Sequence, residues 1–457
     1  MRIQLFLLLN IVCTKHQVSS LSVNQRALES YTIPKTWVPI ASVDELDPNR
    51  PSPIKFLNQK YVTYQDNNDH WVVMDDVCPH RLAPLSEGRI DRDKNVIQCS
   101  YHGWEFGSDG TCSCIPQVTS DVQEKAIKNT QSQVYSYPTA VERNVLWVWP
   151  WLEDPLTVAG DESVHPEGIM KDLPTSFATY TRDVPYGWDS LVENLIDPAH
   201  VPFAHHGMQG KRTDAIPINM TMVGETTEKG FQFEYADRTM GMTRRGIGQF
   251  RAPYLVNYNA TFDTPDARPF LLSALCIPTQ PGWSRVIVLT KRSDEKPKTL
   301  LAKIFSILPP FLMHQLSNRF LDSDLAFLHY QERNAASGHK YYIPSPADRC
   351  IAAYRKWIPT YTNNVVSPDT LPPEMTPSVL FDRYTQHTSH CRHCQDGLKG
   401  IKKWRRTCYG ILTLSVLGIR KFWMARLSTL LCLSMLRVFS KLEKTMKVGG
   451  FKHYENH

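Results

Sequence analysis

Short apolar runs separated by polar turns fill the first third of the chain. Lys60–Tyr64 and His70–Met74 are two such runs, and clusters of Asn, Asp and Gly separate them from their neighbours. Short strands bounded by these turn-forming residues are typical of a small antiparallel β domain. The pattern begins near Trp37 and stops at Pro150, since proline disfavours continuation of a strand. We therefore expect an all-β domain over residues 36–152.

The pattern of apolar positions changes over residues 178–385, where runs typical of strands alternate with stretches typical of helices. Strand-like runs such as Gly230–Tyr235 and Arg285–Thr290 stand beside two helical stretches, near residues 187–200 and 311–335. Such a mixture predicts an α+β domain built around one sheet.

Both ends of the chain carry apolar runs of a different kind. Residues 1–20 have one positive charge and a short apolar run before small polar residues, which predicts a cleaved targeting signal. Residues 386–457 form a tail with two apolar runs, Tyr409–Ile419 and Leu427–Leu436. Each run is shorter than the roughly 20 residues that span a bilayer. We expect a hairpin that lies on, or re-enters, a membrane surface; the alternative is a basic amphipathic helix docked on the body.

Composition and charge narrow the class of protein. With 457 residues, of which 42% are hydrophobic, the chain can bury large cores, so pervasive disorder is excluded. The net charge is +6, but thirteen Lys and Arg and two acids follow residue 398, and the rest of the chain is mildly acidic. A positive tail with apolar runs favours an anionic membrane surface, and we expect no nucleic-acid partner.

The first pattern that carries chemistry pairs cysteine with histidine. Cys78 and His80 form Cys-x-His, and after eighteen residues Cys99 and His102 form Cys-x-x-His. Zinc could use these ligands, although zinc sites usually pair like ligands in one loop. Two cysteines on one iron and two histidines on the other is instead the pattern of a mixed-ligand [2Fe–2S] cluster. The spacing therefore favours iron–sulfur over zinc.

With the flanking Arg81–Gly88 and Tyr101–Phe106, these residues resemble the Rieske domain of Rieske non-haem iron oxygenases. The resemblance implies that both cysteines and both histidines are ligands of a [2Fe–2S] Rieske cluster. It also implies that the second domain has a helix-grip-like antiparallel sheet and holds a mononuclear iron.

A second histidine pattern lies at the start of the predicted α+β domain. His200 and His205 are five residues apart, and Pro202 between them could distort the helix and direct both imidazoles to one metal. Two histidines and a carboxylate form the facial triad of non-haem Fe(II) oxygenases. A histidine-rich helix is more often a core or solvated face, but the preceding cluster motif favours the iron site. His206 is the alternative to His205.

The segment matches the mononuclear-iron motif of the same family, Asn/Glu-x-x-Asp-x-x-His-x-x-x-x-His, at Asn194, Asp197, His200 and His205. The resemblance gives Asn194 and Asp197 catalytic roles. It makes Asp197 a hydrogen-bonded bridge between a Rieske histidine of one subunit and an iron histidine of its neighbour, in a homotrimer.

The third iron ligand must be a carboxylate far along the chain. The predicted helix over residues 311–335 offers two, and we choose Asp324, where the family usually presents an aspartate before an apolar stretch. Asp322 is the alternative. If no metal binds here, either carboxylate would instead serve to cap a helix.

Cys391 and Cys394 form a Cys-x-x-Cys pair before the tail. In isolation the pair could be half of a zinc site or a redox dithiol. After the two upstream motifs, it resembles the C-terminal Cys-x-x-Cys of the plastid pheophorbide a oxygenase-like branch of the family, which precedes membrane helices. The resemblance covers about residues 36–440 and implies a plastid membrane, envelope or thylakoid, reached through the N-terminal signal.

The function implied by this resemblance is an oxygenase that takes electrons from ferredoxin and activates O2 at a mononuclear Fe(II). The substrate implied is a chlorin derived from chlorophyll, a large apolar polycycle. Two rival functions stay open: an oxygenase of a sterol or another apolar polycycle, and a plastid translocon-associated redox protein that uses the Cys391 and Cys394 dithiol.

Overall fold

The computed structural model describes Leu28, residues 32–151, 165–264 and 267–291, Lys303, and residues 307–363, 371–416 and 422–453. The predicted signal, residues 1–20, lies outside these residues. The chain divides into two compact units. The first comprises the residues up to Arg292 together with Leu328–Glu374, and the second comprises Ser293–Phe327 together with Met375–His457.

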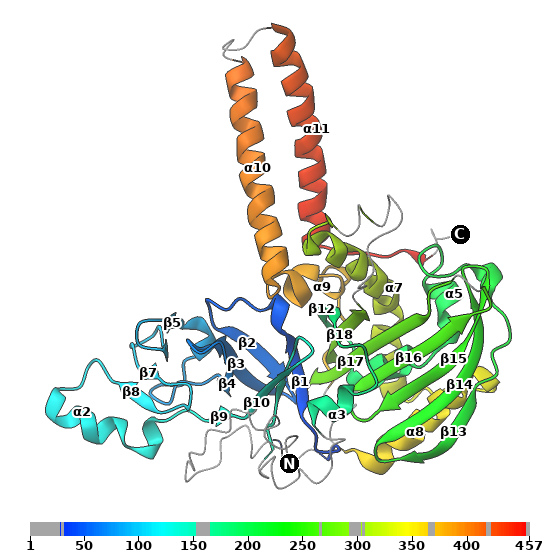
Figure 1. Ribbon diagram of the computed structural model, residues 1–457, viewed down its shortest axis with the longest axis horizontal. Helices are drawn as coiled ribbons and strands as arrows, with labels where there is room; N and C mark the ends of the chain where they lie inside the picture. The colour runs from blue at the N-terminus through cyan, green and yellow to red at the C-terminus, as the bar shows by residue number, and fades with distance from the viewer. Residues whose placement is uncertain are drawn as a thin grey trace. The chain divides into compact units, whose positions relative to one another are not determined.

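The N-terminal part of the first unit is an all-β domain, as its short apolar runs predicted, with one short helix, α2 (Ser120–Ile127), inserted between β8 and β9 (Figure 1). Its strands form three antiparallel sheets with the orders β1-β11-β10, β2-β3-β4-β9 and β5-β6-β7-β8. The strands are β1 Val38–Ser42, β2 Ser52–Phe56, β3 Gln59–Gln65, β4 Trp71–Asp75, β5 Arg89–Asp91, β6 Val96–Gln98, β7 Glu105–Phe106, β8 Cys112–Cys114, β9 Ser136–Tyr137, β10 Thr139–Glu142 and β11 Val145–Val148. Trp37, Tyr61 and Trp147 are fully buried, so large aromatic side chains fill this core.

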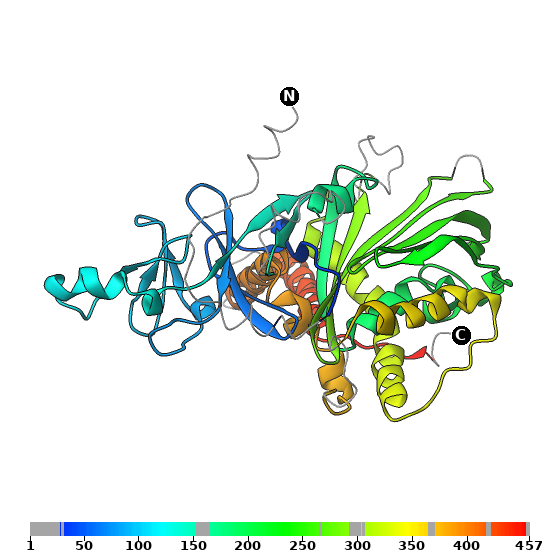
Figure 2. The same cartoon turned by 90° about the horizontal axis from the view of Figure 1, so that it is seen from below.

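The second part of the first unit is built on one seven-stranded antiparallel sheet, ordered β12-β18-β17-β16-β15-β14-β13. Its strands are β12 Phe177–Val184, β13 Thr221–Thr227, β14 Gly230–Thr239, β15 Met242–Arg251, β16 Leu255–Phe262, β17 Phe270–Gln280 and β18 Trp283–Lys291. Helix α4 (Trp188–Leu195) packs on β17 and β18. Helix α8 (Arg349–Tyr361), drawn in yellow, packs on β13 (Figure 2). The predicted α+β fold around one sheet is confirmed.

The second unit contains the tail and the first part of the long helix α7 (Pro310–Ala336), which occupies the helical stretch predicted near 311–335. Helix α9 (Pro377–Leu380) and the π-helical turn η9 (Tyr384–Thr388) lead into α10 (Arg392–Val416), and α11 (Phe422–Lys447) packs against α10. The pair forms an antiparallel hairpin (Figure 1). Both helices extend beyond the predicted apolar runs, because lysine and arginine are good helix formers. Neither these helices nor any other described one combines the length and apolarity that a membrane crossing requires.

Candidate functional site

Two loops of the β domain carry the four predicted cluster ligands: Cys78, His80, Cys99 and His102. The first loop follows β4, and the second lies between β6 and β7. Both loops close in the same way, because the N–H groups of Leu82 and Gly103 each donate to the carbonyl oxygen of the preceding cysteine at 2.9 Å. Gly103 has φ +75°, a left-handed conformation that glycine adopts without strain.

In these four side chains, the cysteine sulfurs face the core of the domain and the histidine imidazoles face its surface. Cys78 and Cys99 are 1% and 2% exposed, whereas His80 is exposed, and the two imidazole centroids lie 4.6 Å apart. Burial raises the pKa of the Cys78 thiol to about 12, so a bound cation is needed to keep it as a thiolate. Thiols facing the core and imidazoles facing the surface fit the predicted mixed-ligand cluster.

The predicted iron histidines flank one short helical turn. His200 ends the 3-10 turn η5 (Pro198–His200), and His205 follows α5 (Val201–Ala204). Pro202 lies in the first turn of α5, where its missing N–H is not needed, so it starts the helix instead of distorting it. The two Nε2 atoms are 3.2 Å apart. Metal–nitrogen bonds of about 2 Å at a right angle would put the nitrogens about 3 Å apart.

The neighbouring residues agree with this choice of histidines. The Nδ1 atom of His206 accepts a hydrogen bond from the Arg212 backbone N–H at 3.1 Å, which holds that ring in the following loop. The Asp197 carboxylate caps η5 by accepting from the Ala199 N–H at 2.8 Å, and its Oδ2 lies 3.5 Å from Nδ1 of His200. The side chain of Asn194, near the end of α4, is half-buried.

The two candidate carboxylates on α7 have different surroundings. Asp322 is fully buried and accepts hydrogen bonds from Nη2 and Nε of Arg383, at 2.7 and 3.1 Å. Asp324 is 3% exposed, and it stands two residues further along the same helix. These surroundings favour an ion-pair role for Asp322, so Asp324 stays the predicted ligand.

The Cys-x-x-Cys pair is fully buried, and two histidines accompany it. Cys391 and Cys394 lie with His314 of α7 and His387 of η9, and the four ligand atoms all lie within 4.8 Å of one another. Burial raises the pKa of Cys391 well above its usual range and lowers that of His314 to about 3, with His393 adding to the second effect. Neither histidine was predicted from the sequence, although His387 stands only four residues before Cys391.

Several buried acidic side chains lie on helix α4 and next to it. Glu332 accepts a hydrogen bond from the Gly187 backbone N–H at 2.9 Å, and Glu193 pairs with Arg355 at 2.8 Å. Burial, and secondarily the nearby Asp189, raise the pKa of Glu332 to about 7. These acids shape the packing around α4, the helix that leads into the histidine segment.

Comparisons with known proteins match two parts of the chain to known families. Residues 36–138 match the Rieske [2Fe-2S] domain family, and residues 250–341 match the pheophorbide a oxygenase family. The chain is 32% identical to pheophorbide a oxygenase, chloroplastic, of Arabidopsis thaliana, across 77% of this chain and 70% of that protein. It is 33% identical to flavonoid 8-hydroxylase 2, chloroplastic, of Ocimum basilicum, across 77% of this chain and 71% of that protein.

Among solved structures, a crystal structure of dicamba monooxygenase bound to dicamba has the same fold. The TM-score is 0.55 with 18% identity, and the match covers 71% of this chain and 96% of that chain. Both relatives named above are chloroplastic proteins.

Proposed function

Because the chain belongs to the pheophorbide a oxygenase family of Rieske oxygenases, we propose that it oxygenates a chlorin derived from chlorophyll. Enzymes of this class are oxidoreductases that use dioxygen, an organic substrate and an electron donor such as ferredoxin. The observation that carries the proposal is the 3.2 Å separation of the two Nε2 atoms in a chain that also has the four-ligand Rieske loops.

The family carries a [2Fe–2S] Rieske cluster and a mononuclear iron, and we assign their ligands. Cys78, His80, Cys99 and His102 would hold the cluster. His200, His205 and Asp324 would hold the Fe(II). When bound, the cluster supplies electrons one at a time and the Fe(II) supplies open coordination positions for dioxygen and substrate.

Asp197 has a positioning role in this proposal. Its Oδ2 lies 3.5 Å from His200 Nδ1, so the carboxylate favours the tautomer with the proton on Nδ1 and leaves Nε2 for the metal. The carboxylate is 23% exposed, so it can also accept an N–H from an imidazole of another subunit. The exposed His80 is suited to supply that N–H, which is the bridge expected in a homotrimer. Asn194, one turn before Asp197, would adjust this hydrogen-bonding network.

We assign the hairpin of α10 and α11 to a plastid membrane surface, envelope or thylakoid. Apolar side chains on α11 are strongly exposed, among them Leu427, Leu430 and Val438 at 61% to 66%. Lysine and arginine lie along the same helices and suit anionic headgroups. A membrane-associated position agrees with a large apolar substrate, which partitions into lipid.

The experiment is an oxygenase assay on the full-length chain after anaerobic reconstitution with iron and sulfide. We expect dioxygen uptake with pheophorbide and reduced ferredoxin, and an oxygen-containing chlorin product by mass spectrometry. A flavonoid is the second substrate class to test, because a relative that is 33% identical is a flavonoid 8-hydroxylase. Turnover of a flavonoid or a sterol, with no uptake on any chlorin, would overturn the proposed substrate.

A further inference from the structure

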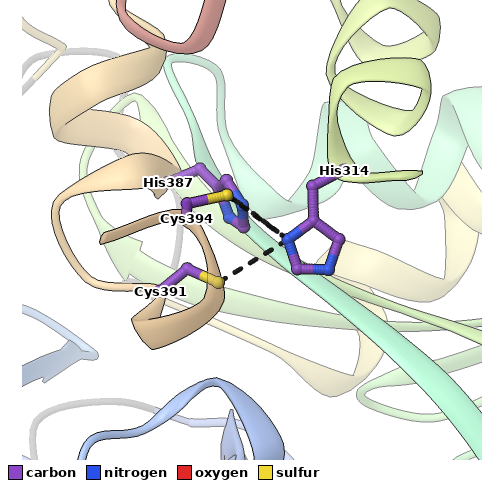
Figure 3. Close-up of side chains that lie close together, drawn as sticks. All are labelled: His314, His387, Cys391 and Cys394. Carbon is purple, nitrogen blue, oxygen red and sulfur yellow. Dashed lines mark hydrogen bonds between the residues drawn. The ribbon is translucent and has the colours of Figure 1, made fainter. Parts of the chain in front are cut away.

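A second group of metal-binding side chains lies in the second unit, and the oxygenase reaction does not use it. Its members come from three segments: α7, the π-helical turn η9, and the start of α10 (Figure 3). They are His314, His387, Cys391 and Cys394, which are 5%, 2%, 1% and 0% exposed. Figure 3 shows the two imidazoles and the two sulfur atoms directed toward one point.

The distances between these side chains are short and nearly equal. The Cys394 sulfur lies 3.3 Å from Nε2 of His387 and 3.5 Å from Nδ1 of His314. The Cys391 sulfur lies 3.6 Å from Nδ1 of His314, and the two ring nitrogens are 3.1 Å apart.

These distances match a tetrahedral centre. Zinc bonds of about 2.3 Å to sulfur and about 2.0–2.1 Å to nitrogen, at tetrahedral angles, put sulfur and nitrogen about 3.5 Å apart. The same geometry puts two nitrogens about 3.3 Å apart. The observed sulfur–nitrogen separations of 3.3 to 3.6 Å lie around the first value, and the nitrogen separation of 3.1 Å is close to the second.

We propose that His314, His387, Cys391 and Cys394 form a structural zinc site. The charges agree with burial: on binding, each thiol loses a proton, and two thiolates with two neutral imidazoles cancel the charge of Zn²⁺. A neutral complex can occupy a buried position, whereas isolated thiolates there would be costly. Two sulfur and two nitrogen ligands in a closed tetrahedron are the set of structural zinc sites.

The backbone around the cysteines is organised to present sulfur. Cys391 directly precedes α10, and the backbone N–H groups of His393 and Cys394 donate to its sulfur. Such N–H groups stabilise a thiolate at the start of a helix. Gln395 donates from Nε2 to the Thr388 carbonyl at 2.7 Å, which ties α10 to the turn that carries His387.

The two imidazoles distinguish a metal site from a simple redox dithiol. A Cys-x-x-Cys disulfide needs only the two sulfurs, whereas His314 is 77 residues away from Cys391 in the sequence and yet within 3.6 Å of both sulfurs. The zinc would therefore tie α7 to η9 and α10. Since α7 also carries Asp324, this tie fixes the helix that bears the proposed iron ligand.

The test is metal analysis of the purified full-length chain, which does not depend on the substrate. We expect about one zinc per chain in addition to about three irons. Absorption at the zinc edge should show two sulfur neighbours at about 2.3 Å and two nitrogen neighbours at about 2.0–2.1 Å. A fourth iron in place of zinc, or a Cys391–Cys394 disulfide by mass spectrometry in zinc-free protein, would overturn the proposal.

Two cysteine variants test which side chains bind the zinc. Cys394→Ser should lower the zinc content at least tenfold while the cluster absorbance is kept. Cys408→Ser is the matched control, since Cys408 is also a buried thiol of α10 but does not belong to the four-residue group. Zinc retained by Cys394→Ser, or lost equally from both variants, would refute the assignment. If Cys394→Ser does not fold, the zinc-edge spectrum of the unaltered chain decides.

Discussion

The two aspartates of α7 give the sharpest prediction, because they are only two residues apart and yet are expected to have very different roles. Asp322→Ala removes the only acidic partner that the described residues show for the Arg383 guanidinium, which is 6% exposed. It also removes the acceptor of the Gly450 N–H, at 3.0 Å. Leaving a buried charge unpaired costs about 3–5 kcal/mol. Arg383 keeps its bond to the Thr445 carbonyl at 2.7 Å, so we expect the lower half of that range.

Asp324→Ala should act on the metal instead. We expect it to lower the iron content from about three to about two per chain, with the cluster absorbance unchanged. Asp322→Ala should keep all three irons under conditions where it is folded, and should lower the free energy of unfolding by about 3 kcal/mol, more than a hundredfold in the unfolding equilibrium.

Iron analysis, the absorption spectrum and denaturant unfolding of both variants, side by side, make the measurement. Full iron retention by Asp324→Ala would return the ligand role to Asp322. Unchanged stability of Asp322→Ala would show that the ion pair with Arg383 does not hold the second unit together.

Three further predictions follow from the first unit and the hairpin. The pKa of Glu332 is raised by burial from 4.5 to about 7, so the free energy of unfolding should fall by about 3 kcal/mol as the pH rises from about 4.5 to 7; Glu332→Gln should remove that slope in denaturant titrations at several pH values. Asp197→Asn keeps an acceptor for the η5 cap but loses the charge beside His200, the proposed iron ligand, so turnover should fall about 10–100-fold with the cluster spectrum unchanged; full activity would contradict the positioning role. Leu427→Asp with Leu430→Asp should weaken cosedimentation with anionic vesicles at least tenfold, since burying each leucine contributes about 1.5–3 kcal/mol, whereas Val122→Asp, at an exposed apolar site outside the hairpin, should not.

Local patterns in the sequence were sufficient to identify much of this protein. The Cys78/His80 and Cys99/His102 spacing was sufficient to predict the Rieske domain that the family match finds over residues 36–138, because all four residues belong to two tight turns whose geometry depends on neighbouring residues. The helical period near residues 187–200 and 311–335 predicted α4 and α7 for the same reason. The alternation of apolar and polar positions was sufficient for the fold class of both domains.

The tertiary structure decided what depends on residues far apart in the chain. Sequence spacing left Asp322 and Asp324 as alternatives, because both lie on one helix and only their partners, Arg383 for Asp322, separate them. It also left Cys391 and Cys394 between half a zinc site and a dithiol, because His314 completes the group only when α7 packs beside the start of α10. Ligands that only tertiary packing brings together have no regular spacing in the sequence, so the sequence pattern alone cannot identify them.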